Sequence, residues 1–201
     1  MKNKQRKYLS IFVLVALTAC TSGPSARIKG SDEGDLIGDK KAGAATYNTQ
    51  VPEAVDKLLE GHRAANPNSR GTLTLCVLGV DNQSAENLLD WEEQLYQLIT
   101  NSINQSGSYT TISRRTVDRA LSEGGLRQDD LLLPRYRKQF AEILEKNGDP
   151  VALLLFPKLT TGTTDSGRKR QRDYLLTLEL IDIASGAQRN FSAPIAKEYE
   201  R

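Results

Sequence analysis

The chain has 201 residues, and its 27 lysines and arginines against 25 aspartates and glutamates give a formal net charge of only +2. A balance this close to neutral gives no support to a nucleic-acid partner, which would need a strongly basic surface. One histidine and two cysteines are too few for a zinc site of the usual spacing, and we expect no metal and no other cofactor. The length suits one domain plus a shorter segment.

The first residues have the form of a secretion signal. Four basic residues and no acid lie within residues 1–7, and residues 8–17 are almost entirely apolar. A run of roughly ten apolar residues is too short to span a bilayer as a helix. The motif Leu17-Thr18-Ala19-Cys20 ends the run, and it resembles a bacterial lipobox.

The lipobox resemblance implies that residues 1–19 are a signal peptide and that Cys20 carries a diacylglycerol and a further fatty acid such as palmitate. Such chains, at about 0.8 kcal/mol per buried methylene, would hold the mature protein on a membrane. The alternative is an ordinary signal peptide with a cysteine that happens to lie near its cleavage site. Without the four bases of the signal, 23 basic residues face 25 acidic ones, a net charge of −2.

Residues 20–48 are predicted to be a flexible tether that starts at the lipidated Cys20. Ser, Gly, Asp, Lys and Ala dominate residues 21–45, and so few large apolar side chains cannot offset the entropy lost on ordering. As a flexible coil, a segment of this length spans roughly 30 Å. We expect residues 49–201 to form the globular domain.

Two strand and helix units are predicted at the start of this domain. Apolar residues at helical spacing from Val51 to His62 predict a helix, and residues 71–80 read as a central strand, apolar on both faces at its end. Residues 81–84 are predicted to be a loop. A helix with an apolar stripe from residue 91 to 103 follows, and then a short strand at residues 109–112. Two strands with a helix between them should be parallel.

The second half of the domain is predicted to begin with helices and to end in an antiparallel meander. Ser113 and Gly124-Gly125 delimit one helix, and Pro134 starts another. The most apolar run, residues 151–156, predicts an interior strand, and alternation over residues 176–180 predicts a strand with one wetter face. A turn then leads to a last strand at residues 188–193. The fold class expected is a single α/β domain whose mixed sheet has about four to five strands.

Residues 157–173 are predicted to be a long, basic loop. Four cations lie within five residues, namely Arg168, Lys169, Arg170 and Arg172. One interpretation is an electrostatic docking tip for an acidic surface or an anionic glycan or lipid, and the other is a solvated tip whose charges discourage edge pairing.

A second candidate for partner binding is the pair Arg114 and Arg115. These cations lie at the start of a predicted helix, where they oppose the helix dipole. They could therefore face a partner.

Catalytic chemistry is not indicated by the sequence. His62 lies on or beside an apolar helix stripe with no nucleophile pattern nearby, which favours a packed imidazole, and Cys76 lies in the middle of a strand, which favours an inert buried thiol. Phosphate-binding, dinucleotide-binding, nucleophile-elbow and calcium motifs are all missing. The sequence therefore favours a binding protein over an enzyme.

Three phrases of the sequence resemble the LpoB family of lipoprotein activators of penicillin-binding proteins. They are residues 71–84 (GTLTLCVLGVDNQS), residues 107–115 (GSYTTISRR) and residues 121–126 (LSEGGL). The wider group includes the curli secretion lipoprotein CsgG and the amino-terminal domain of TolB. The resemblance implies an outer-membrane lipoprotein that faces the periplasm, reaches through the peptidoglycan and stimulates a penicillin-binding peptidoglycan synthase. Thr21, rather than Asp, after Cys20 is similar to outer-membrane sorting signals.

Three hypotheses about function remain open from the sequence. The first is a regulatory module, expected to be monomeric, that binds a peptidoglycan synthase. The second is a secretion or assembly lipoprotein of the CsgG kind, which would need membrane-spanning hairpins that the charged segment from Thr160 to Arg172 does not provide. The third is a glycan-cleaving enzyme with a carboxylate pair, which sequence alone does not distinguish from solvated acids.

Overall fold

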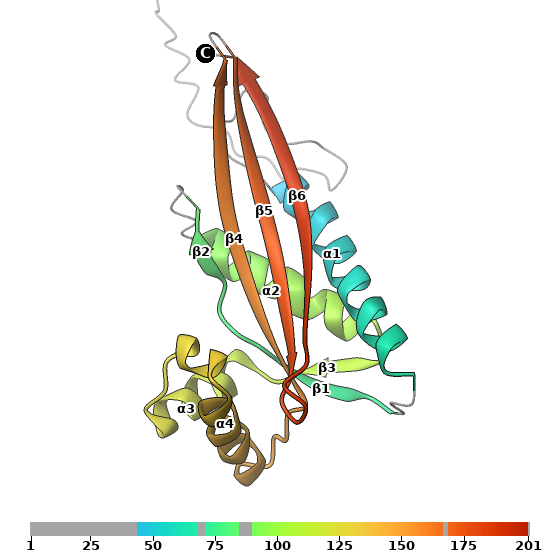
Figure 1. Ribbon diagram of the computed structural model, residues 1–201, viewed down its shortest axis with the longest axis vertical. Coiled ribbons are helices and arrows are strands. Elements are labelled where there is room, and N and C mark those ends of the chain that lie inside the picture. The colour runs from blue at the N-terminus through green and yellow to red at the C-terminus, as the bar shows by residue number, and fades with distance from the viewer. Residues whose placement is uncertain (1–43, 68–70, 85–89, 167–168, 201) are drawn as a thin grey trace, which may run out of the picture. The chain divides into compact units, whose positions relative to one another are not determined.

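The computed structural model describes residues 44–67, 71–84, 90–166 and 169–200, and Figure 1 shows their arrangement. In chain order the elements are α1 (Ala44–Ala65), β1 (Leu73–Val77), β2 (Asp81–Gln83), α2 (Asp90–Gln105), β3 (Tyr109–Thr111), α3 (Arg114–Gly124), the 3-10 helix η1 (Gln128–Leu132), α4 (Pro134–Lys146), β4 (Leu153–Ser166), β5 (Lys169–Asp182) and β6 (Gln188–Glu200). No helix in these ranges has the length and apolar character needed to cross a membrane.

All six strands belong to one mixed sheet. Its order is β3-β1-β4-β5-β6, and β2 pairs with β4 beside this path. β1 is parallel to both β3 and β4, whereas β4, β5 and β6 form an antiparallel meander. The predicted α/β class, the parallel pairing across α2, and the interior position of the strand at 151–156 are therefore confirmed.

The prediction of a long loop at residues 157–173 is wrong. β4 runs to Ser166 and β5 begins at Lys169, and their register continues without interruption from Leu153↔Asp182 to Ser166↔Lys169. The run is polar, but its β-branched threonines suit a strand. β6, which extends to Glu200, pairs with β5 along this whole stretch and completes the backbone hydrogen bonds.

The loop expected at residues 81–84 is also partly a strand. β2 occupies Asp81–Gln83 and lies parallel to β4, with Asp81 opposite Lys158. Three polar residues give no alternating pattern by themselves, and their extended form follows from the neighbouring strand. β2 therefore extends the sheet at the outer edge of β4.

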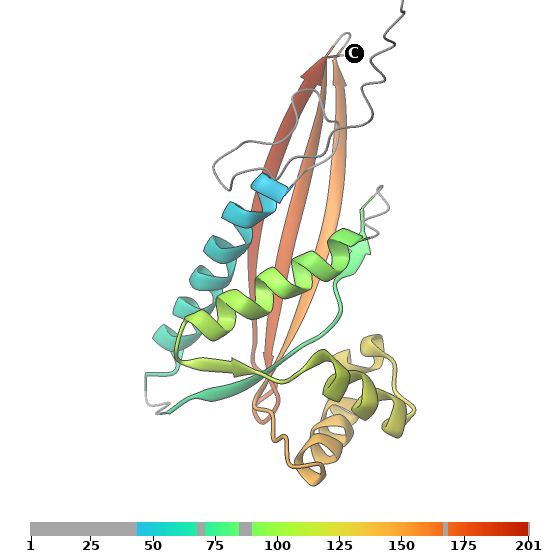
Figure 2. The same ribbon diagram turned by 180° about the vertical axis from the view of Figure 1, so that it is seen from behind.

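The two faces of the sheet are covered unequally. α1 and α2 lie across one face along much of its length (Figure 2), and the core under them includes Val51, Val55, Ile99, Leu176 and Leu178, all fully buried. α3, η1 and α4 cover the other face only at one end of the strands, over the core that contains Cys76, Leu78, Leu154 and Phe140. Farther along β4, no described helix covers this second face.

We call the part of this second face beyond α3, η1 and α4 the helix-free face. Residue pairing shows which side chains lie on it or at its border. The strands carry three successive rows there, namely Phe156 with Glu179 and Asn190, Lys158 with Thr177 and Ser192, and Thr160 with Leu175 and Pro194. The intervening leucines of β5 point to the α1 and α2 side. Alternation of side chains along a strand thus separates a dry face from a mixed one.

The turn after α3 carries the chain towards this face. The Oγ atom of Ser113 accepts a hydrogen bond from the Thr116 amide at 3.2 Å, which caps the start of α3 as predicted. Gly125 has φ +61°, a left-handed conformation that favours glycine, and its amide and that of Leu126 close the helix on Ser122 and Leu121. η1 begins two residues after this turn.

Candidate functional site

A groove of about 410 Å³ lies between η1 and the helix-free face of the sheet, and we call it the η1 groove. Gln128, Asp129 and Leu132 of η1 form one wall. The floor consists of residues from the three rows, namely Phe156, Lys158 and Thr160 of β4, Leu175, Thr177 and Glu179 of β5, and Asn190 of β6. Gly79 and Asp81 border it at the β1 to β2 connection. A Cβ at position 79 would lie 2.9 Å from Nε2 of Gln128, so the glycine leaves room for that side chain.

The η1 groove contains exposed apolar side chains. Among the described residues, only Leu132, Leu133 and Leu175 are large hydrophobic residues with more than a third of their surface exposed, at 49%, 50% and 38%. Leu132 and Leu175 line the groove together with the half-buried Phe156. Leu133 does not line it. The apolar part of the groove therefore includes Leu132 of η1, Phe156 of β4 and Leu175 of β5, and Pro157 of β4 also lines it.

The backbone that carries Leu132 is held by buried hydrogen bonds. The Arg137 side chain is only 7% exposed, and its Nη1 donates to the carbonyl oxygens of Leu131 at 3.2 Å and Leu132 at 2.7 Å. The Leu133 amide donates to the Asp130 carbonyl at 2.9 Å. Leu131 is fully buried in the core between α3 and α4. The exposed Leu132 therefore projects from an ordered segment.

The η1 groove carries more negative than positive charge. Asp81, Asp129 and Glu179 line it, against Lys158 alone. Asp81 Oδ2 accepts from Gln83 at 2.7 Å and Glu179 Oε1 accepts from Gln188 at 2.6 Å, which orients both carboxylates without neutralising them. None of these four residues forms an ion pair within the part of the chain that the structure describes.

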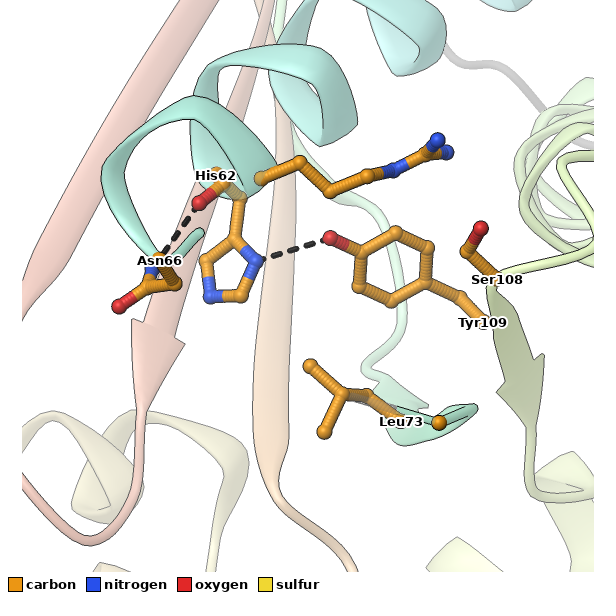
Figure 3. Close-up of a pocket in the computed structure, with 7 residues that line it drawn as sticks. His62, Asn66, Leu73, Ser108 and Tyr109 are labelled. Atoms are coloured by element: carbon orange, nitrogen blue, oxygen red, sulfur yellow. Dashed lines mark hydrogen bonds between the residues drawn. The ribbon is translucent and has the colours of Figure 1, made fainter. Parts of the chain in front are cut away.

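A second, smaller hollow of about 230 Å³ lies at the carboxyl end of α1, beside the starts of β1 and β3 (Figure 3). His62 Nδ1 and the Tyr109 hydroxyl lie 2.8 Å apart there, and the Asn66 amide donates to the His62 carbonyl at 2.9 Å. Burial lowers the pKa of His62, Arg189 lowers it further, and Asp182 partly opposes them. This arrangement fits the packed imidazole expected from the sequence, and nothing in it resembles a nucleophile with its base.

Cys76 is the other side chain with possible chemistry in the described ranges. It is fully buried in the sheet, and burial raises the pKa of its thiol far above the ordinary value, with a smaller contribution from Asp118. Such a thiol is unreactive. Within these ranges no group of three or more His, Cys, Asp or Glu side chains could hold a metal ion.

The structure describes the backbone of three of the four residues of the predicted basic cluster. Arg168 and Cys20 fall outside the described residues, while the backbone of Lys169, Arg170 and Arg172 belongs to β5 and pairs with β4 and β6. The cluster therefore lies at the end of a three-stranded ribbon instead of in a loop. Its role in binding stays a prediction.

Arg114, one of the two other predicted partner-binding residues, has partners within the domain. Its Nη1 lies 2.7 Å from Glu93 Oε2, its Nη2 lies 4.0 Å from Glu92 Oε1, and its guanidinium lies 5.1 Å from the centre of the Tyr96 ring. These contacts join α3 to α2 and place acids beside a cation that the helix dipole disfavours. Arg115, the next residue, is exposed.

The sequence did not predict the η1 groove. A usable signal was present in the three successive leucines 131–133 directly before Pro134, because a single turn of chain cannot direct all three into one core. In the other half of the groove, Phe156 and Glu179 lie in predicted strands and Leu175 lies just before one. The register that places Phe156 beside Glu179 and Thr160 beside Leu175 was not predicted from the sequence.

The family model described as peptidoglycan-synthase activator LpoB matches residues 47–188. Among solved structures, the LpoB C-terminal domain from Escherichia coli has a TM-score of 0.50 and 17% identity, and the match covers 75% of this chain and 98% of that one. The NMR structure of E. coli LpoB has a TM-score of 0.46 and 14% identity, covering 96% and 94%. The LpoB C-terminal domain from Salmonella enterica has a TM-score of 0.45 and 17% identity, covering 77% and 98%. No curated protein sequence matches the chain significantly.

Proposed function

Because the chain belongs to the LpoB family of peptidoglycan-synthase activators, we propose that it binds a penicillin-binding peptidoglycan synthase and raises the rate of cell-wall synthesis. The observation that carries this proposal is the family match over residues 47–188, which includes most of α1, every element from β1 to β5 and the first residue of β6. The shared fold with the E. coli domain supports it.

The proposed location is the periplasmic side of the outer membrane, with the lipid anchor on Cys20. The motif Leu17-Thr18-Ala19-Cys20 and the residue Thr21 support this location. In this proposal residues 1–19 are removed, residues 20–48 tether the domain and residues 49–201 form it. α1 begins at Ala44, so residues 44–48 at the end of this tether already belong to the helix.

We also propose that the chain activates its partner by binding alone, as a monomer and without catalysis of its own. The buried His62 and Cys76 support this, since neither side chain is placed for proton transfer or nucleophilic attack. The conformational state of the synthase would then change because the activator binds one state more tightly than the other.

The experiment is a reconstitution with the lipidated full-length chain. The chain is added in detergent to a purified penicillin-binding synthase of the same organism, and glycan polymerisation and peptide cross-linking are measured on a lipid-linked precursor. We expect both binding and a higher rate. The proposal would be refuted if the chain bound a synthase without changing its rate, or if it bound none of the organism's penicillin-binding synthases.

The basic cluster is tested in the same assay. Replacing Arg168, Lys169, Arg170 and Arg172 with glutamine should weaken docking and reduce its dependence on salt, if these cations face an acidic surface. Affinity equal to that of the unchanged chain would leave them as a solvated, aggregation-resistant strand end.

A further inference from the structure

We infer that the η1 groove is the surface on which the synthase docks, and that it receives a protruding segment with an aliphatic side chain beside a lysine or arginine. This inference rests on the proposed function and assigns that function to a particular surface. It is carried by three features of the groove: rigid exposed leucines, a volume that fits a few side chains, and uncompensated carboxylates.

The exposed leucines are placed as binding anchors. Leu132 and Leu175 are 49% and 38% exposed, while Leu176 and Leu178, the neighbouring apolar residues of β5, are fully buried under α1 and α2. Leu175 shares its row with Thr160, so it projects from the helix-free face. An apolar side chain in water at an ordered position can be buried by a partner at little entropic cost.

Arg137 makes the position of Leu132 independent of a partner. Its buried guanidinium donates to the Leu131 and Leu132 carbonyl oxygens, and the backbone there is closed by the bond from Leu133 to Asp130. The anchor is therefore preorganised in the free protein, which is the property expected of a residue that contributes to affinity.

The volume of the groove limits what enters it. About 410 Å³ holds a few side chains of a loop or extended segment and is far smaller than a folded domain. The remaining contact area of a stable complex must then come from the surface around the groove. The occupant is consequently a projection from the partner.

Charge indicates the chemistry of that projection. Asp81, Asp129 and Glu179 line the groove against one lysine, and no described residue forms an ion pair with any of them. These carboxylates would repel an anionic glycan or lipid head group. They would attract a cationic side chain, and the attraction becomes stronger as water leaves the groove. The apolar residues Leu132, Phe156 and Leu175 accept its aliphatic neighbour.

Two matched pairs of variants test the inference in the lipidated full-length chain. Leu132→Asn changes the groove, and Leu133→Asn changes the adjacent leucine, which is equally exposed but does not line it. Asp129→Asn combined with Glu179→Gln removes two groove charges, and Asp56→Asn combined with Glu60→Gln removes two exposed charges from α1, which covers the opposite face.

Affinity for the purified synthase is measured for all four variants, with thermal melting to verify folding. Leu132→Asn is expected to weaken binding about tenfold, equal to about 1.4 kcal/mol, while Leu133→Asn leaves it nearly unchanged. Neutralising the groove acids should weaken binding at low salt, and the difference from the α1 pair should vanish at about 1 M salt.

The outcomes separate this inference from the proposed function. If the unchanged chain binds and stimulates the synthase, but the loss for Leu132→Asn is less than threefold larger than for Leu133→Asn, the groove is overturned and the function stands. Equal effects of the two charge pairs, or tighter binding without the groove acids, would overturn the cationic occupant. If the unchanged chain neither binds nor stimulates, the proposed function itself fails.

Discussion

Two buried tyrosines provide a sharp test of the hydrogen bonding in this fold, because one hydroxyl has a partner and the other has none. Tyr96 is 3% exposed, and its hydroxyl has no hydrogen-bond partner among the described residues. Tyr109 is 2% exposed, and its hydroxyl lies 2.8 Å from His62 Nδ1. Replacing each by phenylalanine removes one oxygen atom from a similarly buried site.

The two substitutions should change stability in opposite directions. An unpaired buried hydroxyl costs about 1–3 kcal/mol in mutational data, and its removal from Tyr96 also loses some dispersion contacts, so we expect a net gain of about 1 kcal/mol. At Tyr109, a hydrogen bond worth about 0.5–1.5 kcal/mol is lost and the His62 nitrogen loses its partner, so we expect a loss of about 1–2 kcal/mol. Burial also raises the pKa of Tyr96 to about 12, with the Cys76 thiol as the second cause.

The assay is urea unfolding and thermal melting followed by circular dichroism. For a domain of this size, about 1 kcal/mol shifts the melting temperature by about 2–4 °C, so Tyr96→Phe should raise it and Tyr109→Phe should lower it. The dependence of unfolding on urea should be unchanged in both, since the exposed surface is the same. If Tyr96→Phe destabilises the protein as much as Tyr109→Phe, its hydroxyl is satisfied and the reasoning is refuted.

Three further predictions concern charged side chains. The folded pKa of His62 lies below its ordinary value of 6.5 because of burial, so on acidification the unfolded chain takes up the proton first. The contribution of His62 to stability is therefore complete above the unfolded pKa and is lost as the pH falls from there through the folded pKa. His62→Gln should remove this dependence from urea midpoints measured between about pH 8 and pH 5, and an unchanged slope would contradict it. Arg137→Met leaves two carbonyl groups without their donor and should lower stability by about 2–3 kcal/mol, and a loss under about 0.5 kcal/mol would show that these bonds are not formed. Arg114→Ala breaks a half-exposed pair with Glu93 and should lower stability by less than about 1 kcal/mol, an effect that should shrink in salt; a larger loss that persists in salt would contradict a screened surface pair.

Much of the architecture was predictable because it is encoded by local periodicity. The apolar stripe of α1, which includes Val51, Val55 and Leu59, recurs at helical spacing and is buried against the sheet. The run at residues 151–156 is apolar enough for an interior strand, and it lies between β1 and β5. Parallel pairing of β1 and β3 follows from the helix between them. The family resemblance also came from the sequence alone.

The pairing of polar strands depended on residues far away in the chain. Residues 157–173 have no apolar alternation over their full length, and the described parts, residues 157–166 and 169–173, form strands because β4 pairs with β5 and β6 continues beside β5 as far as Glu200. β2 is extended because β4 lies next to it. Propensity and pattern are local quantities, whereas the backbone hydrogen bonds that extend a strand come from a neighbour that the pattern does not name.

The sequence by itself determined the helices α1 to α4 and the interior strands β1 and β4, and it carried the family resemblance. The tertiary structure alone decided which of three successive leucines is buried, which tyrosine hydroxyl has a partner, and that Arg114 contacts Glu93 rather than projecting freely. The physical reason is that periodicity depends on the spacing of neighbours along the chain, whereas burial, charge pairing and an open groove depend on which surfaces meet after folding.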